Sequence, residues 1–427
     1  MVSDENELRK AIQILYGNDE LLIEKQIKRY LMLSDDFKTH FDSDSLFYFS
    51  TPGRTELGGN HTDHNNGLVL TGSINLDSIA VVSKSIYNTV ELFSEGYDTE
   101  FVVTLDNLEP LPEERGTTNA LIRGVAARFK QLGYSIAGFN ASMSSDVLPG
   151  SGLSSSASIE VLIGSIFNAL FNNNSIAPEI LAQIGQYAEN HYLGKPCGLM
   201  DQMACAVGGI ISIDFKDPLN PVFRKVNFNF DKHNYKLLVL DTGGSHADLT
   251  DDYSSIPAEM KSVAGLFGVS VLREVSINPF IEKIPYVRKQ LGDRAVLRAL
   301  HFLEENNRVR EEVLALESGD FHGFLNLIKA SGDSSFKWLQ NIFTVKNIKE
   351  QGLSLALALS EKFIEEIGEG ACRVHGGGFA GTIQIFLPNN RVEEYKKNMG
   401  KIFGKESVQV LKIRSQGAVC LNILKKN

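Results

Sequence analysis

The spacing of apolar and polar positions along the chain changes several times between the helical and the strand period. Helical spacing over residues 19–37 and again over 118–132 predicts two amphipathic helices. The apolar run 46–53 predicts a strand that ends at Pro52 and Gly53 and delivers Arg54 to a loop. Further short runs predict strands at 77–85, 89–95, 100–106, 208–215, 235–244, 381–388, 407–414 and 417–424.

The segment 139–171 combines a strand, a turn rich in glycine and serine, and a helix that is apolar on all sides. A helix with no polar face is expected to be buried. Helical patterns dominate from about residue 256 to 370, and strands return at the C-terminus. This alternation predicts an α+β protein of two lobes, 1–215 and 216–427.

Size, charge and cysteine content narrow the class of protein. A chain of 427 residues is long enough for two domains. A net charge of -10 argues against a nucleic-acid partner, because no basic field is present to displace phosphate counterions. The four cysteines show no zinc-binding spacing, and neither a signal peptide nor a long apolar run is apparent. We therefore expect a cytoplasmic protein with reduced thiols that does not bind membranes.

The segment "LPGSGLSSSAS", residues 148–158, carries the strongest chemical signal. Its glycines allow backbone N–H groups to turn toward one anion, and the serines lie where a helix N-terminus offers unpaired donors. Phosphate is the expected ligand, although a serine cap after a tight turn fits the same residues. The segment lacks the Gly-Lys-Ser/Thr of a Walker A loop.

Four blocks together resemble the galactokinase branch of the GHMP small-molecule kinase superfamily. "GRTELGGNHTDHNNGLVL" (53–70) is similar to the sugar signature, and "LPGSGLSSSAS" to the nucleotide loop. "AENHYLGKPCGLMDQ" (188–202) and "GACRVHGGGFAGT" (370–382) are similar to the remaining family motifs. The blocks occur in family order over most of the chain, which one chance match would not produce.

The resemblance implies a fold and an activity. The expected fold has an N-terminal mixed-sheet α/β lobe, a ferredoxin-like C-terminal lobe and an active site in the cleft between them. The expected reaction uses ATP and Mg²⁺ to phosphorylate the anomeric hydroxyl of D-galactose, giving galactose 1-phosphate. The expected partners are therefore small molecules: a sugar and ATP.

The resemblance also implies roles for individual residues. Arg54 and Asp201 match the pair at the reacting hydroxyl, where a carboxylate can act as general base; a structural ion pair between lobes would use the same residues. Ser156 and Glu189 match the positions that meet magnesium, with the choice among the three loop serines left open. The sugar-binding positions are Asn60, His61, Asp63, Gly198 and Tyr253; the nucleotide-binding positions are Gly150, Ser151, Gly152, Leu153, Ser154, Ser155, Ser156, Ala157, Gly377 and Gly378.

Several positions depart from the family pattern. Asn60 replaces the glutamate that holds the C6 hydroxyl, which makes a galacturonate kinase the second hypothesis, because the repelling charge is gone. "TNALIRG" (118–124) replaces the aromatic run on the adenine side. A non-catalytic sugar sensor and a kinase for another small metabolite are further alternatives. The intact serine loop speaks against the sensor, and the "HTDH" and "CGLMDQ" blocks speak against the other kinase.

Overall fold

A computed structural model of the chain describes residues 5–147, 152–195, 197–244 and 249–423. Two β-sheets organise these residues, and helices pack on both. The strands are β1 (Phe47–Gly58), β2 (Leu68–Lys84), β3 (Thr89–Ser94), β4 (Phe101–Thr104), β5 (Phe139–Ser145), β6 (Ile210–Asp214), β7 (Val222–Val226), β8 (Tyr235–Asp241), β9 (Ala371–Val374), β10 (Thr382–Pro388), β11 (Val408–Leu411) and β12 (Val419–Cys420). The α-helices are α1 (Glu5–Tyr16), α2 (Glu20–His40), α3 (Thr118–Gln131), α4 (Ser155–Phe171), α5 (Pro178–Ala188), α6 (Met200–Val207), α7 (Thr250–Leu266), α8 (Ile277–Ser318), α9 (Phe321–Ser334), α10 (Gly352–Ile367) and α11 (Val392–Phe403).

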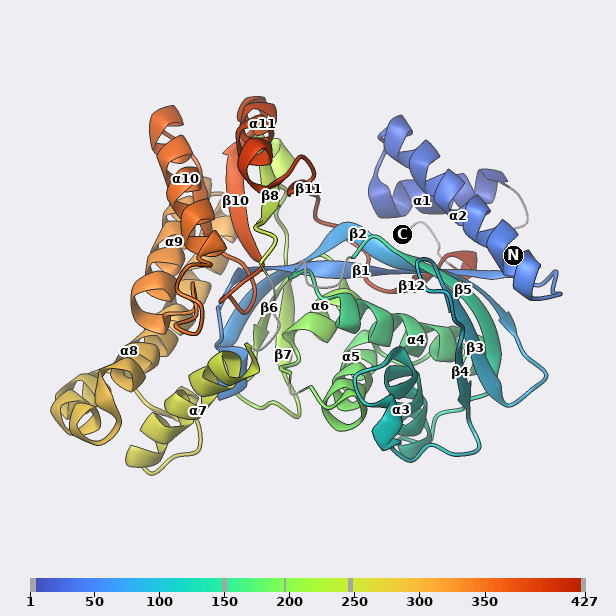
Figure 1. The fold of residues 1–427 in the computed structure, drawn as a ribbon, viewed down its shortest axis with the longest axis horizontal. Coiled ribbons are helices and arrows are strands. Elements are labelled where there is room, and N and C mark those ends of the chain that lie inside the picture. The colour runs from blue at the N-terminus through green and yellow to red at the C-terminus, as the bar shows by residue number, and fades with distance from the viewer. Residues whose placement is uncertain (1–4, 148–151, 196, 245–248, 424–427) are drawn as a thin grey trace.

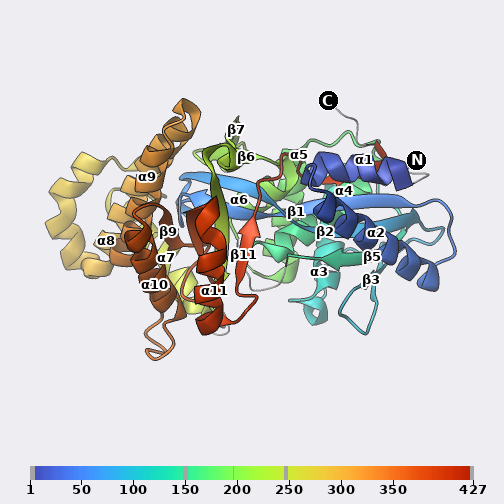
Figure 2. The ribbon, with the colours of Figure 1, turned by 90° about the horizontal axis from the view of Figure 1, so that it is seen from above.

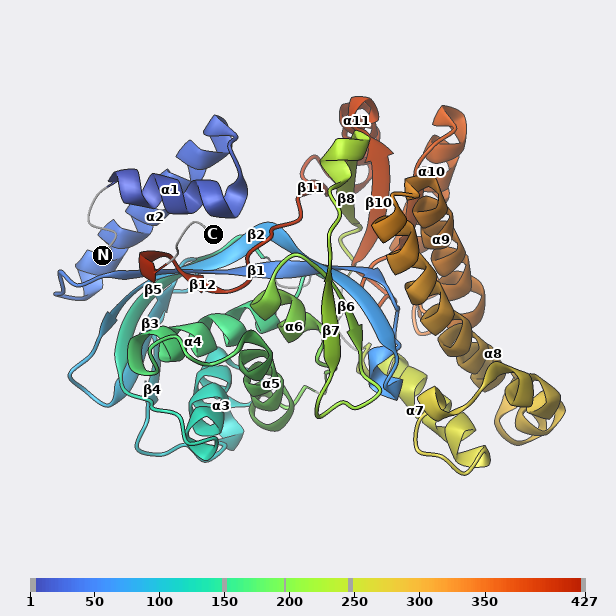
Figure 3. The same cartoon turned by 180° about the vertical axis from the view of Figure 1, so that it is seen from behind.

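The first sheet has eight strands, and its main path runs in the order β12-β1-β2-β5-β3-β4. The long strand β2 pairs with β6 through its first residues and with β5 through its last ones. Figures 1 and 3 show α3, α4, α5 and α6 on one face of this sheet and α1 and α2 on the other. Helix α4 is apolar on nearly every side and lies in the core, as its sequence predicts.

The second sheet has four antiparallel strands in the order β11-β8-β10-β9. If these four strands are numbered in chain order, their order across the sheet is 4-1-3-2. Helices lie between β8 and β9 and between β10 and β11, so the arrangement is ferredoxin-like. Helix α8 has one non-helical residue, Gly292, at φ 82°. The expected α+β fold with two sheet-based lobes is confirmed.

A helical hairpin of α1 and α2 covers the outer face of the first sheet above β2 and β5 (Figure 2). Beneath it lies a buried charged cluster centred on Asp77 of β2. The Asp77 carboxylate accepts hydrogen bonds from Arg29 Nη1 at 2.6 Å and Arg414 Nη1 at 3.0 Å, and also from Tyr16 and Ser50. These bonds offset the cost of burying the carboxylate, and they join the hairpin to the C-terminal segment.

The observed elements correct one expectation that bears on the site. Strand β1 does not end at Pro52 but continues to Gly58, so Arg54 lies on the strand itself rather than on a loop. The strand accommodates Pro52 because its register against β2 shifts between Pro52 and Arg54, where a missing N–H breaks no regular ladder. The lobe boundary near residue 215 stays a prediction; β7 and β12 pair into the first sheet.

Candidate active site

Arg54 and Asp201 form a two-pronged ion pair that joins β1 to the first turn of α6. Arg54 Nε lies 2.7 Å from Asp201 Oδ1, and Nη2 lies 2.7 Å from Oδ2. The third guanidinium nitrogen donates to the carbonyl of Gly152. The arginine is nearly buried, whereas the Asp201 side chain is 32% exposed. The carboxylate is therefore fixed in orientation and still open to a substrate.

A serine hydroxyl links this ion pair to the N-terminus of α4. Ser154, the N-cap residue, donates its hydroxyl to Asp201 Oδ2 and makes no side-chain cap to the helix. Burial disfavours the charged form of Asp201, but Arg54 and Ser154 outweigh this and lower its pKa. The carboxylate is thus ionised at neutral pH. The uncapped first turn of α4 keeps its N–H groups and positive dipole end available for an anion.

Ser156, in the first turn of α4, lies against Glu189, which begins the π-helical turn η3 (Glu189–Leu193). Ser156 Oγ donates to Glu189 Oε1 at 2.8 Å, and Lys195 Nζ donates to the same oxygen at 2.9 Å. Gln202 Nε2 bridges Glu189 Oε2 at 2.8 Å and Glu160 Oε2 at 3.0 Å. Burial, followed by the nearby Glu189, raises the pKa of Glu160 well above its usual value.

These oxygens fit magnesium, which prefers hard oxygen ligands and keeps several waters or phosphate oxygens. Glu160 Oε1 and Gln202 Oε1 are buried without a hydrogen-bond partner, so acceptors remain unsatisfied beside Glu189. Within the described residues, no group of three or more His, Cys, Asp or Glu side chains could hold a metal ion by itself. A metal at Ser156 and Glu189 would therefore need further ligands from water or from a bound phosphate.

The expected sugar-binding residues Asp63 and Gly198 lie against each other. Asp63 belongs to the short helical turn η1 (Asp63–Asn65) that follows β1, and its Oδ1 accepts the backbone N–H of His64 at 2.9 Å. A Cβ atom placed on Gly198 would lie 1.8 Å from Asp63 Oδ2. Only glycine at position 198 allows the two segments to approach this closely.

His61 and Tyr253 both contact the glycine-rich turn after β9. His61 Nε2 lies 2.8 Å from the carbonyl of Gly377, and Tyr253 donates its hydroxyl to the carbonyl of Gly378 at 2.8 Å. Burial lowers the pKa of His61 to about 3, so the ring is neutral and Nε2 carries the proton that is donated. Both side chains therefore hold this turn in place.

Asn60, which the resemblance assigns to the sugar, makes its side-chain hydrogen bonds within the protein. The side chain is fully buried, its Nδ2 donates to Glu56 Oε1 at 3.0 Å and to Gly376 O at 2.7 Å, and its Oδ1 accepts from Asn341 at 2.8 Å and Ser335 at 3.2 Å. An amide can make two donor and two acceptor bonds, and all four are used within the protein. No capacity is left for a sugar hydroxyl.

Two buried residues outside the predicted site support β1 and the loop that follows it. His375 Nε2 accepts the backbone N–H of Glu56 at 3.3 Å, and its Nδ1 bonds the Thr382 hydroxyl at 3.0 Å. Glu305 of α8 accepts the backbone N–H groups of Gly59 at 3.2 Å and Asn60 at 3.4 Å. His375 lies inside the block 370–382, and that position is the signal that could have identified it. No local pattern distinguishes Glu305 from the other charged residues of α8.

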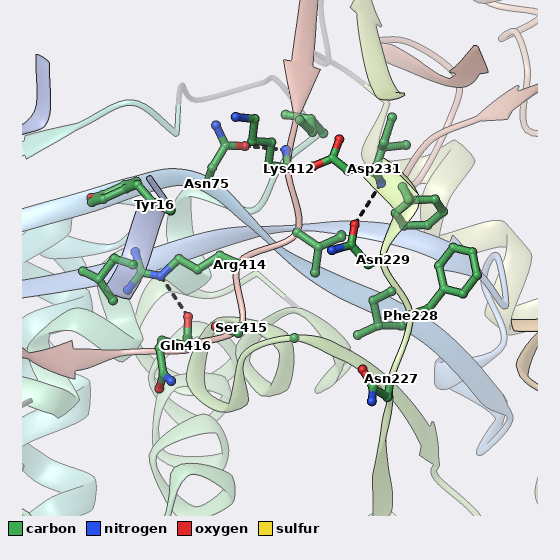
Figure 4. Close-up of a pocket in the computed structure, with 18 of the residues that line it drawn as sticks. Tyr16, Asn75, Asn227, Phe228, Asn229, Asp231, Lys412, Arg414, Ser415 and Gln416 are labelled. Carbon is green, nitrogen blue, oxygen red and sulfur yellow. Dashed lines mark hydrogen bonds between the residues drawn. The ribbon is translucent and has the colours of Figure 1, made fainter. Parts of the chain in front are cut away.

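The remaining nucleotide-side positions are described only in part. Gly150 and Ser151 fall outside the described residues. Gly152 and Leu153 precede α4, whereas Ser155 and Ala157 lie in its first turn. The run 118–124, which replaces the family's aromatic residues, forms the start of α3 and is buried from Ala120 onward. A cavity of about 830 Å³, lined mainly by 14–19, 225–231 and 411–416, contains none of the candidate residues (Figure 4).

No helix in the described part of the chain is both long and apolar enough to cross a bilayer.

Two family models match the chain. The description "GHMP kinases N terminal domain" covers residues 120–209, and "Galactokinase galactose-binding signature" covers residues 35–84. The first match contains α4, Glu189 and Asp201, and the second contains Arg54, His61 and Asp63.

Curated relatives extend the likeness to most of the chain. A galactokinase of Glaesserella parasuis serovar 5 is 31% identical over 381 residues, which are 87% of this chain and 93% of that protein. A galactokinase of Streptomyces coelicolor is 28% identical and covers 89% of this chain and 95% of its own length.

Solved structures share the fold. Lactococcus lactis galactokinase in complex with galactose superposes with a TM-score of 0.78 at 24% identity, covering 92% of this chain and 99% of that chain. Mevalonate kinase of Methanococcus jannaschii gives 0.59 at 18% identity, with 87% and 99% covered. Together with the curated relatives, these matches show that the chain belongs to the galactokinase family of GHMP kinases.

Proposed function

We propose that this chain transfers the γ-phosphoryl group of ATP to the anomeric hydroxyl of D-galactose, giving galactose 1-phosphate. The observation that carries the proposal is the bonded series Arg54, Asp201 and Ser154. It joins an accessible carboxylate, suited to a hydroxyl substrate, to the open N-terminus of α4, suited to a phosphate. Both reactants of a sugar kinase would thus meet at one point.

Asp201 is the proposed acceptor of the sugar proton. Its lowered pKa keeps it ionised and also makes it a weak base. A weak base is sufficient because phosphoryl transfer passes through a loose transition state with little bond formation to the attacking oxygen. The proton would therefore move to Asp201 late, as the hydroxyl becomes acidic on bonding to phosphorus. Arg54 would hold the carboxylate in line and stabilise the charge on the transferred group.

Ser156 and Glu189 are proposed to hold Mg²⁺, which when bound would neutralise charge on the β- and γ-phosphates. Gln202 would keep Glu189 in place through its 2.8 Å bond to Oε2. Asp63, beside the bare backbone of Gly198, is the proposed carboxylate for sugar hydroxyls, because two hydroxyl bonds to one anion distinguish epimers.

We further propose that Asn60 holds the sugar loop and does not contact the sugar, because its four hydrogen bonds are internal. The galacturonate hypothesis rested on this residue and loses its support with it. The sensor hypothesis predicts an incomplete site, whereas Arg54, Asp201 and Ser154 form one bonded group and Ser156 and Glu189 form a second.

The test is ADP release from Mg·ATP with D-galactose, D-galacturonate, N-acetylgalactosamine and D-glucose, together with ³¹P NMR of the product. We expect the highest kcat/KM for D-galactose and a signal for a sugar 1-phosphate. A higher kcat/KM for D-galacturonate would show that the loop accepts a C6 carboxylate after all. Binding of galactose without turnover would support the sensor.

A further inference from the structure

Lys195 lies at the proposed metal position but belongs to none of the roles assigned above. Its ammonium group and the Ser156 hydroxyl donate to the same oxygen, Glu189 Oε1, at 2.9 Å and 2.8 Å. Nζ and Oγ can therefore be no farther apart than the sum of these two distances. The positively charged ammonium group of Lys195 is thus bonded to Glu189 Oε1, the oxygen that the proposed Mg²⁺ would bind.

The surroundings favour movement of the lysine over movement of the carboxylate that it contacts. The Lys195 side chain is 65% exposed, so no packing fixes its four-carbon stem. It follows Gly194, a left-handed residue at φ 79° that ends the π-helical turn η3 (Glu189–Leu193). Glu189 itself is 2% exposed and is held from behind by Gln202, so the carboxylate stays while the ammonium group can leave.

The local charges determine where a released ammonium group would go. Glu189 and Asp201 contribute two carboxylates, and Arg54 is already paired with Asp201. The uncapped first turn of α4, which contains Ser156, is the proposed phosphate site. An ATP molecule there would add several negative charges beside the Lys195 ammonium group, which is the strongest attraction available to a mobile cation.

We propose that Lys195 is a phosphate-binding residue of the kinase reaction, which holds Glu189 in the free protein and passes to the ATP phosphates when ATP binds, leaving Glu189 Oε1 open to Mg²⁺. The proposal rests on the proposed function, because it needs ATP at the N-terminus of α4. Lys195 and Mg²⁺ would then compete for Glu189 Oε1, but both would neutralise negative charge on the ATP phosphates. Removing the lysine should therefore harm ATP binding most when magnesium is absent.

The test is isothermal titration calorimetry of ATP binding to the full chain, with EDTA and then with saturating Mg²⁺, and without sugar. We expect Lys195→Met to weaken ATP binding in EDTA about tenfold or more, the usual size for loss of a charged hydrogen bond to phosphate. The loss should be smaller with Mg²⁺. Lys195→Arg should restore most of the affinity, because it keeps the charge.

Lys337→Met is the matched control. Lys337 is 63% exposed, and its Nζ pairs with Asp333 Oδ1 at a distance of 3.0 Å. This pair contains none of the proposed site residues. It should change ATP affinity less than twofold. If Lys195→Met leaves ATP affinity in EDTA unchanged and lowers only the melting temperature, the lysine merely braces Glu189 and the proposal is wrong. Because no sugar is present, failure of D-galactose as a substrate would not alter either outcome.

Discussion

Replacing Asn60 by glutamate distinguishes two roles for this residue, contact with the sugar and support of the sugar loop, because the two roles predict opposite results. If Asn60 touches the sugar, Asn60→Glu restores the family's residue at the C6 hydroxyl and should lower the KM for D-galactose without loss of stability. If Asn60 instead holds the loop, as its contacts indicate, the same change should be strongly destabilising.

The size of the destabilisation follows from the contacts. Asn60→Glu removes the two bonds that Nδ2 donates to Glu56 and Gly376, at about 1 kcal/mol each. It also adds a methylene group at a position with no exposed surface, at about 1–3 kcal/mol, and turns an anion toward the Glu56 carboxylate. We expect a total of about 3–5 kcal/mol, or a melting temperature lower by roughly 3–6 °C for a chain of 427 residues.

The assay is differential scanning calorimetry together with steady-state kinetics on D-galactose. Asn60→Asp, which has nearly the shape of asparagine, separates the effect of charge from that of volume. Asn307→Glu serves as the control, because Asn307 is exposed on α8 and its new carboxylate could still pair with Arg310. An Asn60→Glu protein of unchanged melting temperature and lower KM would refute the assignment of Asn60 to the loop.

Two further changes test other parts of the site. Gly198→Ala should raise the KM for D-galactose severalfold while ATP affinity measured by calorimetry stays unchanged, because its Cβ would lie 1.8 Å from Asp63 Oδ2; an unchanged KM would contradict a sugar site at this contact. Glu305 has a folded-state pKa of about 2, below its usual 4.5, because Arg308, the nearby His301 and other partners outweigh the effect of burial. Its contribution is therefore complete above pH 4.5 and is lost as the pH falls toward 2, so Glu305→Gln should cost about 3 kcal/mol at pH 7 and less with each step into acid. Melting temperatures of both proteins between pH 7 and pH 3 check this, and a difference that does not shrink in acid would count against it.

The motifs indicated pairs of distant segments more readily than the residues that support them. Arg54 and Asp201, 147 positions apart, form one bonded pair, and Ser156 and Glu189 form a second. The motifs work because each fixes a backbone shape as well as a side chain. The four blocks therefore indicated which distant segments meet.

The role of Asn60 could not be read from its own motif. Its partners Ser335 and Asn341 lie 275 and 281 positions away, in a segment that none of the quoted blocks covers. The sequence shows the loss of a charge at position 60 but not the amide and hydroxyl that occupy the space around it. Burial and pairing at long range decide such a residue, and local pattern does not report them.

Strand β1 shows a similar limit of local rules. Proline usually ends or borders a strand, so the sequence predicts that the strand stops at Pro52. The register shift against β2 absorbs the missing N–H, and the strand runs on to Gly58. This extension places Arg54 on a rigid element, which suits a residue that must orient Asp201.

The proposed reaction depends most on Asp201 as the residue that receives the sugar proton. The most direct measurement is turnover of D-galactose by Asp201→Asn with Mg·ATP, alongside calorimetric binding of galactose and of ATP to the same protein. We predict that kcat falls by about a thousandfold or more while both ligands still bind, because the amide keeps the shape and cannot accept the proton. Retention of full activity by Asp201→Asn would contradict the account.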